Sequence, residues 1–440
     1  MAVQKGYRKT LVFITTLFFL WGFVAVFTDA LVPRLKDVFG LTYLEASMVR
    51  FAFFITYLLF SIPATFILNK IGYRYSIVVG LLTMATGCFI VYPAASERIF
   101  FLFLVAIFVL ASGVTLLQSV ANQYVSTQDK DVLASGKLNV SQAFNALGTT
   151  IAPIVGAIYI LSDRVMMPDE IGMLSSFEQS VYFTTETTVV VLPFTVIAIV
   201  LLLLTIVFLF AKFPKMGGEK QLFRWKEYVT VLNKQSLLFG AIAIFLYVGA
   251  EVAIGSFLVN YFIETNIIKH VFESNFIGSA IVNFGKFLGR NLIEDDSKTI
   301  AGIFVTFYWG GAMIGRFAGV FLSKIIAPAK LLILFSLGAM ISILISINTD
   351  GLTSMWSILA VGFFNSIMFP SIFALTLDGL EDFKTETSGI LCTMIGGGAI
   401  IPLVFGFFID HIGFRMAFLS LVACYGFILF FGYYKRFIRF

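Results

Sequence analysis

Long hydrophobic runs separated by short polar breaks make up most of this sequence. About a dozen of these runs reach the length of about 20 residues that an α-helix needs to cross the core of a bilayer. We predict spans at 11–33, 46–68, 76–95, 99–125, 136–161, 187–211, 236–263, 300–323, 330–347, 353–377, 387–409 and 415–434. The pattern therefore predicts an all-α polytopic membrane protein of twelve transmembrane helices, with both termini on one side.

The polar breaks differ in charge and length, which predicts how the chain is divided. The longest basic break, FPKMGGEKQLFRWKEYVTVLNKQ at 213–235, lies between the sixth and seventh runs. We interpret it as a cytoplasmic linker between an N-terminal six-helix bundle, 1–212, and a C-terminal six-helix bundle, 236–440. The break at 162–180 is acidic and fits an external loop, whereas 264–299 is expected to hold a short interfacial helix.

Small residues and prolines recur at a fixed distance along the two predicted bundles. Gly148 and Pro153 of the fifth span are followed 249 residues later by Gly397 and Pro402 of the eleventh. The loop NKIGYRYS after the second span is echoed by SKIIAPAK after the eighth. Transporters are often built from such duplicated halves. The shared offset favours two parallel repeats of six spans.

Composition and charge agree with this picture and add an orientation. Of the 440 residues, 59% are hydrophobic and 12% are charged, and the mean hydropathy is +0.96, well beyond the usage of soluble domains. Lysine and arginine gather in the breaks on the N-terminal side, and such residues stay preferentially in the cytoplasm. We expect a multi-pass protein of the cell inner membrane, surrounded by the lipid bilayer, with both termini cytoplasmic.

The rarer residue types exclude several classes of chemistry. The three cysteines lack CxxC spacing and the two histidines fall outside the best hydrophobic runs, so neither disulfides nor a metal site is indicated. Neither a nucleophile motif nor a soluble domain is apparent, which argues against an enzyme. We expect no cofactor other than a proton as the coupling ion, no nucleic-acid partner and a monomeric state. Proton chemistry inside the membrane must then use carboxylates.

Two carboxylates lie within predicted spans and are candidates for proton coupling. A charged group costs about 2.5 to 3.5 kcal/mol at the centre of a membrane helix, so Asp29 and Glu251 each need a cavity or a partner. Asp29 is alternatively hydrated by headgroups near the outer end of its span. Glu251 is a second proton site, an acceptor for substrate, or a structural partner of Arg316.

Amide side chains gather in two neighbouring spans. At helical spacing, each set falls near one face: Gln118 and Asn122 in the fourth span, and Asn139, Gln142 and Asn145 in the fifth. Sugar hydroxyls are recognised by such neutral donors and acceptors. The alternative is that amides bridge helices, which we weigh equally for Asn122 and Asn139. Asn260 and Asn365 are further substrate-binding candidates from the second half.

Three charged residues near span ends are candidates for gating or structural roles. Arg74 follows the second span, Arg316 lies within the eighth, and Asp378 ends the tenth. The surrounding YWGGAMIGRFAG of the eighth span carries Gly311 and Gly315 at a small-xxx-small spacing, which allows close helix packing.

Several motifs together resemble one family of membrane transporters. They are FFLWGFVAVFTDALVPRLK (18–36), ASGVTLLQSVANQYV (111–125), LNVSQAFNALGTTIAPIVG (138–156), YVGAEVAIGSFLVNYF (247–262), YWGGAMIGRFAG (308–319), FFNSIMFPSIFALTLDGL (363–380) and GILCTMIGGGAIIPLVFG (389–406). Their order in both halves is similar to the fucose/galactose/glucose:proton symporter family of the major facilitator superfamily, nearest its glucose/galactose branch.

The resemblance implies roles for particular residues and also has departures. It implies that Asp29 matches the family's essential carboxylate and that Gln142 and Asn145 match its sugar-binding pair. The family usually has glutamine where this chain has Arg50, and the fucose branch has glutamate at the position of Gln118. One of two acidic groups is therefore missing at those positions.

These observations lead to a functional hypothesis with one alternative. We expect proton-coupled symport of a neutral monosaccharide, of the glucose/galactose or fucose type, by alternating access with Asp29 as the proton carrier. The alternative is a proton-driven antiporter of drugs or other small organic molecules, which would use acids in an aromatic pocket. The cluster of amides favours a sugar.

Overall fold

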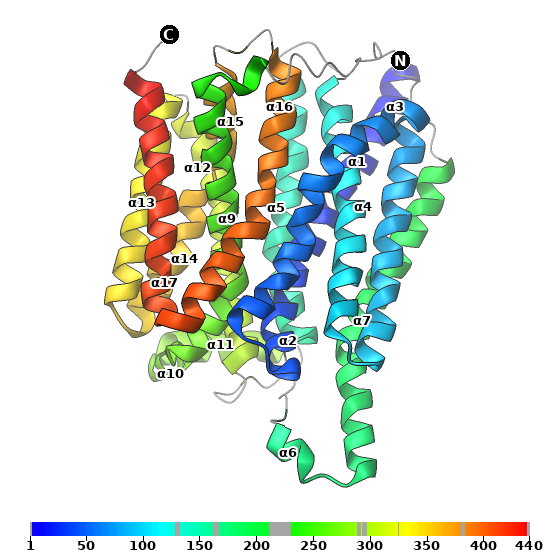
Figure 1. Cartoon of the computed structure of the whole chain (residues 1–440), viewed down its shortest axis with the longest axis vertical. Helices are drawn as coiled ribbons and strands as arrows, with labels where there is room; N and C mark the ends of the chain where they lie inside the picture. The colour runs from blue at the N-terminus through cyan, green and yellow to red at the C-terminus, as the bar shows by residue number, and fades with distance from the viewer. Residues whose placement is uncertain are drawn as a thin grey trace.

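The computed structural model describes residues 2–127, 133–161, 168–210, 230–287, 297–323, 325–378 and 383–437, with the single residues 166, 292 and 380. Within these ranges every regular element is helical. The helices run side by side in one bundle, and both termini lie at the same end of it (Figure 1). The predicted all-α class is confirmed.

The first half contains α1 (Ala2–Phe27), η1 (Thr28–Ala30), α2 (Leu31–Phe39), α3 (Tyr43–Ser96), α4 (Phe100–Thr127), α5 (Leu133–Tyr159), α6 (Pro168–Gly172) and α7 (Ser176–Phe210). Helix α3 covers the second and third predicted spans. The two parts meet at Gly72, whose backbone angles (φ 76°, ψ 172°) are not helical and suit glycine. The chain reverses there.

The second half contains α9 (Gln235–Glu264), α10 (Ile267–Glu273), α11 (Asn275–Phe287), α12 (Ser297–Leu322), α13 (Pro328–Asn348), α14 (Gly351–Asn365), α15 (Met368–Leu377), α16 (Lys384–Thr393), η4 (Met394–Gly396) and α17 (Gly397–Phe437). The short helices α10 and α11 lie where a short helix was expected, at the end opposite the termini (Figure 1).

Ten helical segments of the described chain are long and apolar enough to cross a membrane. The last of them, Glu386–Phe437, contains the reversal at Gly413 and so includes two predicted spans, and the apolar part of α5 is Ala143–Tyr159. The described helices are therefore consistent with twelve crossings. Most of the predicted linker lies outside the described residues, because 211–229 are not described.

The glycines related by the offset of 249 residues have the same packing role in both halves. Gly148 of α5 faces the backbone carbonyl of Phe19 on α1, and Gly397 of α17 faces that of Phe245 on α9. A methyl group at either position would overlap that carbonyl. Each half thus packs its fifth span closely against its first.

A second internal similarity is visible in the backbone. Gly413 (φ 74°, ψ 167°) has nearly the same conformation as Gly72, and the two lie in DHIGFRMA and NKIGYRYS respectively. From the sequence we paired NKIGYRYS with SKIIAPAK, and this match was not predicted. The two similar turns lie at opposite ends of the bundle (Figure 1).

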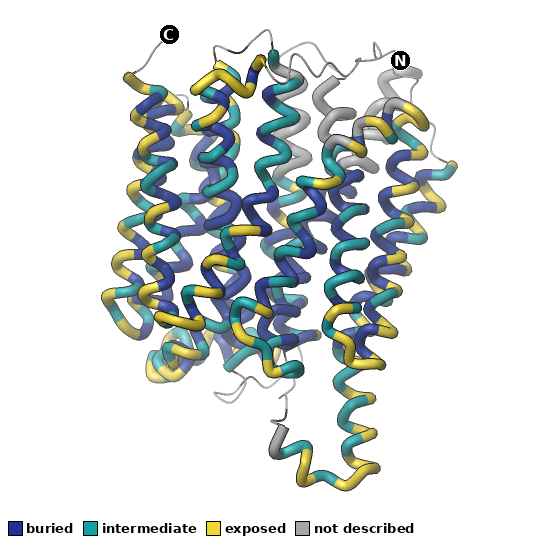
Figure 2. Tube along the Cα trace, viewed as in Figure 1, coloured by how far each residue is buried: buried dark blue, intermediate teal, exposed yellow. Residues whose placement is uncertain are grey.

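Buried residues line the surfaces between helices, and exposed ones lie on the outside of the bundle (Figure 2). Many of the exposed side chains are large and apolar, for example Phe66, Leu203 and Phe307. A soluble domain rarely exposes so much apolar surface. The distribution agrees with a bundle whose outer face contacts lipid.

Candidate functional site

Asp29 lies in η1, the single 3-10 turn between α1 and α2. Pro33, four residues later, has no N–H to donate to the carbonyl of Asp29, which accounts for the local change from the α-helical pattern. The turn packs against α5 and α9. The Asp29 side chain is 12% exposed, so it is largely enclosed by protein rather than hydrated at a helix end.

The carboxylate of Asp29 contacts both halves of the protein. Arg50 of α3, only 2% exposed, forms an ion pair with it, and Ser256 of α9 donates a hydrogen bond to its Oδ1 at 2.7 Å. The Arg50 guanidinium also donates to Thr28 Oγ1 at 3.1 Å and to the carbonyl of Ala25 at 3.2 Å. Asp29 therefore joins the first half to the second.

Neither partner of Asp29 was identified from the sequence. Arg50 was noted only as a departure from a resemblance, although a lone arginine within a membrane span requires an anion nearby. That signal was available. No such signal in the sequence pointed to the hydroxyl of Ser256, because serine is common in membrane helices for packing reasons.

Glu251, the other carboxylate predicted for proton coupling, lies in a separate cluster within the second half. The groups whose charge or hydrogen bonding influences its carboxyl group are the guanidinium of Arg316 on α12 and the hydroxyl of Tyr247, one turn earlier on α9. No ion pair within 4 Å joins Glu251 to Arg316 among the described residues. The pairing of Glu251 with Arg316, which was the structural alternative, is therefore not seen among the described residues, whereas Arg50 lies beside Asp29.

Asn365 occupies the centre of a fully buried polar network. Its Nδ2 donates to Tyr308 Oη at 2.9 Å, and its Oδ1 accepts from Tyr425 Oη at 2.8 Å. Tyr308 Oη in turn donates to the main-chain carbonyl of Glu251 at 3.1 Å. The network joins α9, α12, α14 and α17. This arrangement favours a role in holding helices together over contact with substrate.

We expect Asn365→Leu to lower the free energy of unfolding by about 1–3 kcal/mol, because it removes two buried hydrogen bonds and leaves the Tyr425 hydroxyl without its described acceptor. The affinity for substrate should stay unchanged. Equilibrium unfolding in mixed micelles and a binding titration on the same preparation measure the two quantities. A large loss of affinity with unchanged stability would instead assign Asn365 to the substrate site.

The remaining amide candidates are placed as follows. Gln118 Oε1 accepts a hydrogen bond of 2.6 Å from Tyr57 Oη of α3, and Asn145 Nδ2 donates to the carbonyl of Phe18 on α1 at 3.1 Å. Asn260 Oδ1 is buried without a hydrogen-bond partner among the described atoms. The side chains of Asn122, Asn139 and Gln142 lie outside the described residues.

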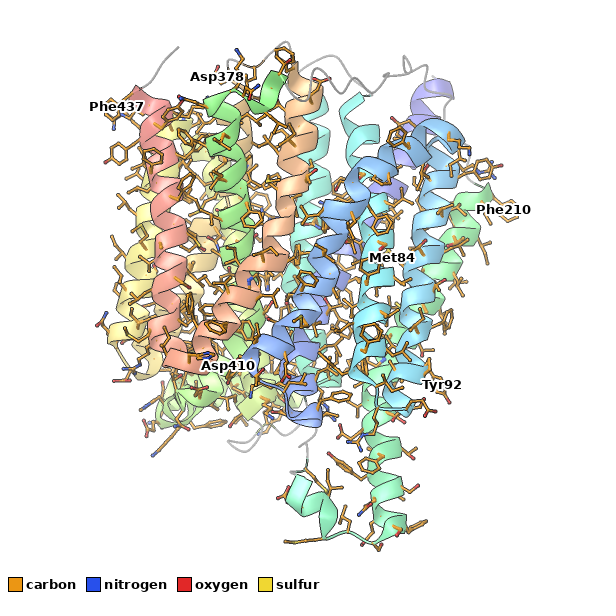
Figure 3. The ribbon with its side chains drawn as sticks, in the orientation of Figure 1. Met84, Tyr92, Phe210, Asp378, Asp410 and Phe437 are labelled. Carbon is orange, nitrogen blue, oxygen red and sulfur yellow. The ribbon has the colours of Figure 1, made fainter. Side chains whose placement is uncertain are left out.

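The two other gating candidates lie at the end of the bundle that carries the termini. Asp378 is exposed there (Figure 3), and its main-chain carbonyl accepts from Lys435 Nζ at 3.4 Å. The guanidinium of Arg74 lies 5.4 Å from the ring centre of Tyr75. Neither side chain forms a hydrogen bond or an ion pair between the halves among the described residues.

The opposite end of the bundle carries polar contacts between the halves. Asp37 of α2 forms an ion pair with Lys298 of α12. Tyr43 Oη of α3 donates to Glu264 of α9 at 2.9 Å. With the cap described next, we call these contacts the closed end. They hold the two halves together on the side that the sequence predicts to be external.

Asp410 closes the same end by capping a helix of the other half. Its two carboxylate oxygens accept from the backbone N–H groups of Tyr43 and Leu44, each at 2.8 Å, at the start of α3. These N–H groups have no partner inside the helix, and the helix dipole favours a negative charge there. Figure 3 shows Asp410 at the end opposite Asp378.

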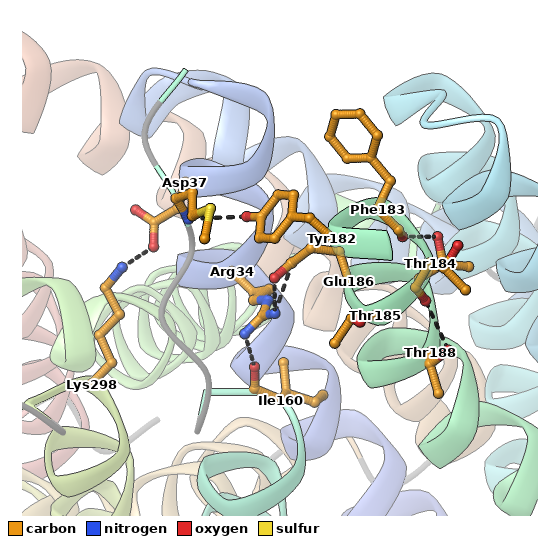
Figure 4. A network of polar contacts seen from close by, with 12 residues as sticks. Arg34, Asp37, Ile160, Tyr182, Phe183, Thr184, Thr185, Glu186, Thr188 and Lys298 are labelled. Atoms are coloured by element: carbon orange, nitrogen blue, oxygen red, sulfur yellow. Dashed lines mark hydrogen bonds and ion pairs between the residues drawn. The ribbon is translucent and has the colours of Figure 1, made fainter. Parts of the chain in front are cut away.

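A second buried ion pair lies within the first half, beside the closed end (Figure 4). The Nη2 of Arg34 donates to both carboxylate oxygens of Glu186 at 2.7 Å, and its Nη1 donates to the carbonyl of Ile160 at 2.9 Å. The arginine is 1% exposed. It ties together α2, the end of α5 and α7. This pair was not predicted from the sequence.

Comparison with known proteins identifies the family. The model of the Major Facilitator Superfamily matches residues 11–295. A glucose/galactose transporter of Brucella abortus is 40% identical over 429 residues, which are 98% of this chain and 94% of the relative. The chain belongs to the Major Facilitator Superfamily. The predicted resemblance to its fucose/galactose/glucose:proton symporter family is confirmed.

More distant members of the superfamily agree in sequence and in fold. The L-fucose-proton symporter of Escherichia coli is 29% identical over 93% of this chain and 89% of its own length. The crystal structure of the superfamily transporter FucP in the outward conformation matches with a TM-score of 0.70 and 28% identity, covering 98% of this chain and 99% of that one. The predicted superfamily fold is confirmed.

Proposed function

We propose that this protein carries a neutral monosaccharide, of the glucose/galactose or fucose type, together with a proton across the inner membrane, with Asp29 as the proton carrier. The single observation that carries the proposal is the position of this carboxylate. It is enclosed by protein, it lies at the junction of the two halves, and it contacts a residue of each. A change in the protonation of a carboxylate in this position alters its contacts with both halves.

The nature of the substrate rests on the relatives and on the amide side chains. The relatives are named as a glucose/galactose transporter and an L-fucose-proton symporter, and both names describe transport of sugars rather than an enzymatic reaction. Gln118 and Asn145 are half-buried amides in helices α4 and α5, next to the helix that leads into Asp29. Neutral amides suit the hydroxyl groups of a sugar.

The cycle that follows is alternating access between two halves. Protonation of Asp29 favours the state that opens to the outside and binds sugar. Release of the proton and sugar to the cytoplasm resets the carrier. If the coupling acts through binding, proton and sugar must each raise the affinity of the other, because linkage is reciprocal. The carrier works as a monomer with both termini in the cytoplasm and needs no bound cofactor.

Uptake into proteoliposomes tests the proposal. With the membrane potential clamped and one proton carried per sugar, a gradient of about one pH unit supports about tenfold accumulation, because about 1.4 kcal/mol is a factor of ten. We expect this accumulation for one or more members of a panel of glucose, galactose, fucose, mannose and N-acetylglucosamine. Failure of every sugar would favour a different small organic cargo.

Asp29→Asn separates carriage of the proton from carriage of the sugar. The amide cannot bind and release a proton, so we expect accumulation to fall to the level of the external sugar while exchange of labelled for unlabelled sugar continues. Both are measured in the same vesicles. Accumulation by the variant against a sugar gradient would contradict the assignment of Asp29 as the proton carrier.

A further inference from the structure

Arg50 is a buried cation whose contacts gather around one carboxylate. Its side chain is 2% exposed within the first membrane-spanning part of α3. Its guanidinium pairs with Asp29 and donates to the hydroxyl of Thr28 and the carbonyl of Ala25, one and four residues before Asp29 in the chain. A buried arginine is costly, and the ion pair and both described hydrogen bonds of this one are made to Asp29 and to residues shortly before it in the chain.

The surroundings of Asp29 contain one charge and one hydroxyl that act on it. Among the described residues of the helices packed around η1, these are Arg50 of α3 and Ser256 of α9. Glu251, also on α9, is influenced by Arg316 and Tyr247 instead. The position implied to hold a second acid in the fucose branch is Gln118, which is neutral and bonded to Tyr57. Among the described residues, no second carboxylate contacts Asp29.

A buried carboxylate without a cation holds its proton, because burial disfavours the charged form. A proton carrier must also give that proton up on the inner side. Resting on the proposed function, we propose that Arg50 is the positioning residue for proton coupling: its fixed guanidinium takes the place of the proton on Asp29 and so drives proton release in each cycle. The proton passes from external water to the Asp29 carboxylate and then to cytoplasmic water, while Arg50 keeps its charge throughout.

The contacts of the Asp29 carboxylate also link the binding and release of the proton to the movement of the halves. Arg50 and Ser256 both contact Oδ1 of Asp29, and Ser256 belongs to the opposite half. An ionised carboxylate accepts both contacts, whereas protonation removes the ion pair and weakens the bond from Ser256. The ionised state is thus linked to the closed end seen here. When Asp29 is protonated, Arg50 retains the Thr28 hydroxyl and the Ala25 carbonyl as partners.

Arg50→Gln tests the role of the guanidinium. We expect this variant to continue exchange of labelled for unlabelled sugar, while accumulation driven by about one pH unit falls from about tenfold to none. The pH dependence of sugar affinity between pH 5.5 and 8.5 should also flatten, since Asp29 stays protonated. Arg50→Lys keeps a positive charge and should retain part of the accumulation. A purely structural arginine would instead give equal losses of exchange and accumulation.

Arg415→Gln is the matched control. It removes an arginine that also pairs with an aspartate, Asp350, but both side chains are exposed and both belong to the second half. Accumulation should be unchanged. Full accumulation by Arg50→Gln would overturn the inference. A different result would refute the proposed function. Wild-type protein that does not accumulate sugar, or an Asp29→Asn variant that still does, refutes the proposed function whatever Arg50→Gln shows.

A double variant keeps the test decisive if Arg50→Gln folds poorly. Asp29→Asn alone leaves Arg50 as a buried cation without its anion, so Asp29→Asn/Arg50→Gln should be at least as stable as Asp29→Asn and should exchange sugar at the same rate. Thermal unfolding in detergent and exchange assays compare the two. A double variant that is less stable and slower than Asp29→Asn would show that Arg50 serves something other than the charge of Asp29.

Discussion

Replacing Glu186 by alanine is expected to lower the free energy of unfolding by about 3–5 kcal/mol, because it leaves a buried cation without its anion. The guanidinium of Arg34 is 1% exposed and loses both of its 2.7 Å bonds to the carboxylate. Of its described partners, the carbonyl of Ile160 remains, and it carries no full charge. Equilibrium unfolding in mixed detergent micelles measures the loss.

Two further variants make this prediction specific. Asp350→Ala breaks the Arg415–Asp350 pair, whose side chains are 47% and 79% exposed, and should cost about 0–1 kcal/mol, as surface pairs do. The double variant Arg34→Met/Glu186→Leu replaces both charges by apolar groups and should recover most of the stability. If Glu186→Ala costs no more than Asp350→Ala, the pair does not have the energetic role that its burial implies.

The course of the helices was predictable wherever hydrophobicity alone decides it. Helix α9 begins and ends within one residue of its predicted span at 236–263. Helix α7 begins at Ser176, eleven residues before the predicted span at 187. Its start is set by a capping box, in which Ser175 and Glu178 bond each other's backbone N–H groups. The Ser-x-x-Glu spacing was present in the sequence, and the search for apolar runs overlooked it.

The candidate site was predictable as a set of residues but not as a set of pairs. Asp29 stood out because a carboxylate in an apolar run is costly. Its partners lie on α3 and α9, and their identity depends on which helix faces η1, which a single sequence does not contain. For the same reason Asn365 was a candidate for substrate binding, whereas its amide is occupied by Tyr308 and Tyr425.

At the closed end, too, the pattern of side chains along the sequence does not show which residues contact each other. Asp410 follows a hydrophobic run and lies three residues before Gly413, as expected for a residue near a turn. Its bonds reach the backbone of Tyr43 and Leu44, more than 360 positions away in the chain. Such contacts depend on how the halves dock. The relation of this turn to NKIGYRYS became evident only from the shared backbone angles of Gly72 and Gly413.

Cross-linking the two halves at the closed end is expected to abolish transport. We propose cysteines at Asp37 and Lys298, which pair across the halves and are 29% and 35% exposed, in a background without Cys88, Cys392 and Cys424. A thiol cross-linker with a cleavable disulfide should stop both accumulation and exchange, because alternating access requires this end to open. Reduction of the linker should restore both activities.

The control pair lies at the same end but within one half. Cysteines at Asp350 and Arg415, which also form an ion pair, receive the same reagent without joining the halves. Transport should continue after cross-linking there. Because both pairs are ion pairs with accessible side chains at the same end, a block confined to positions 37 and 298 isolates the movement of one half against the other. Undiminished exchange after complete cross-linking of 37 to 298 would show that the external opening lies elsewhere.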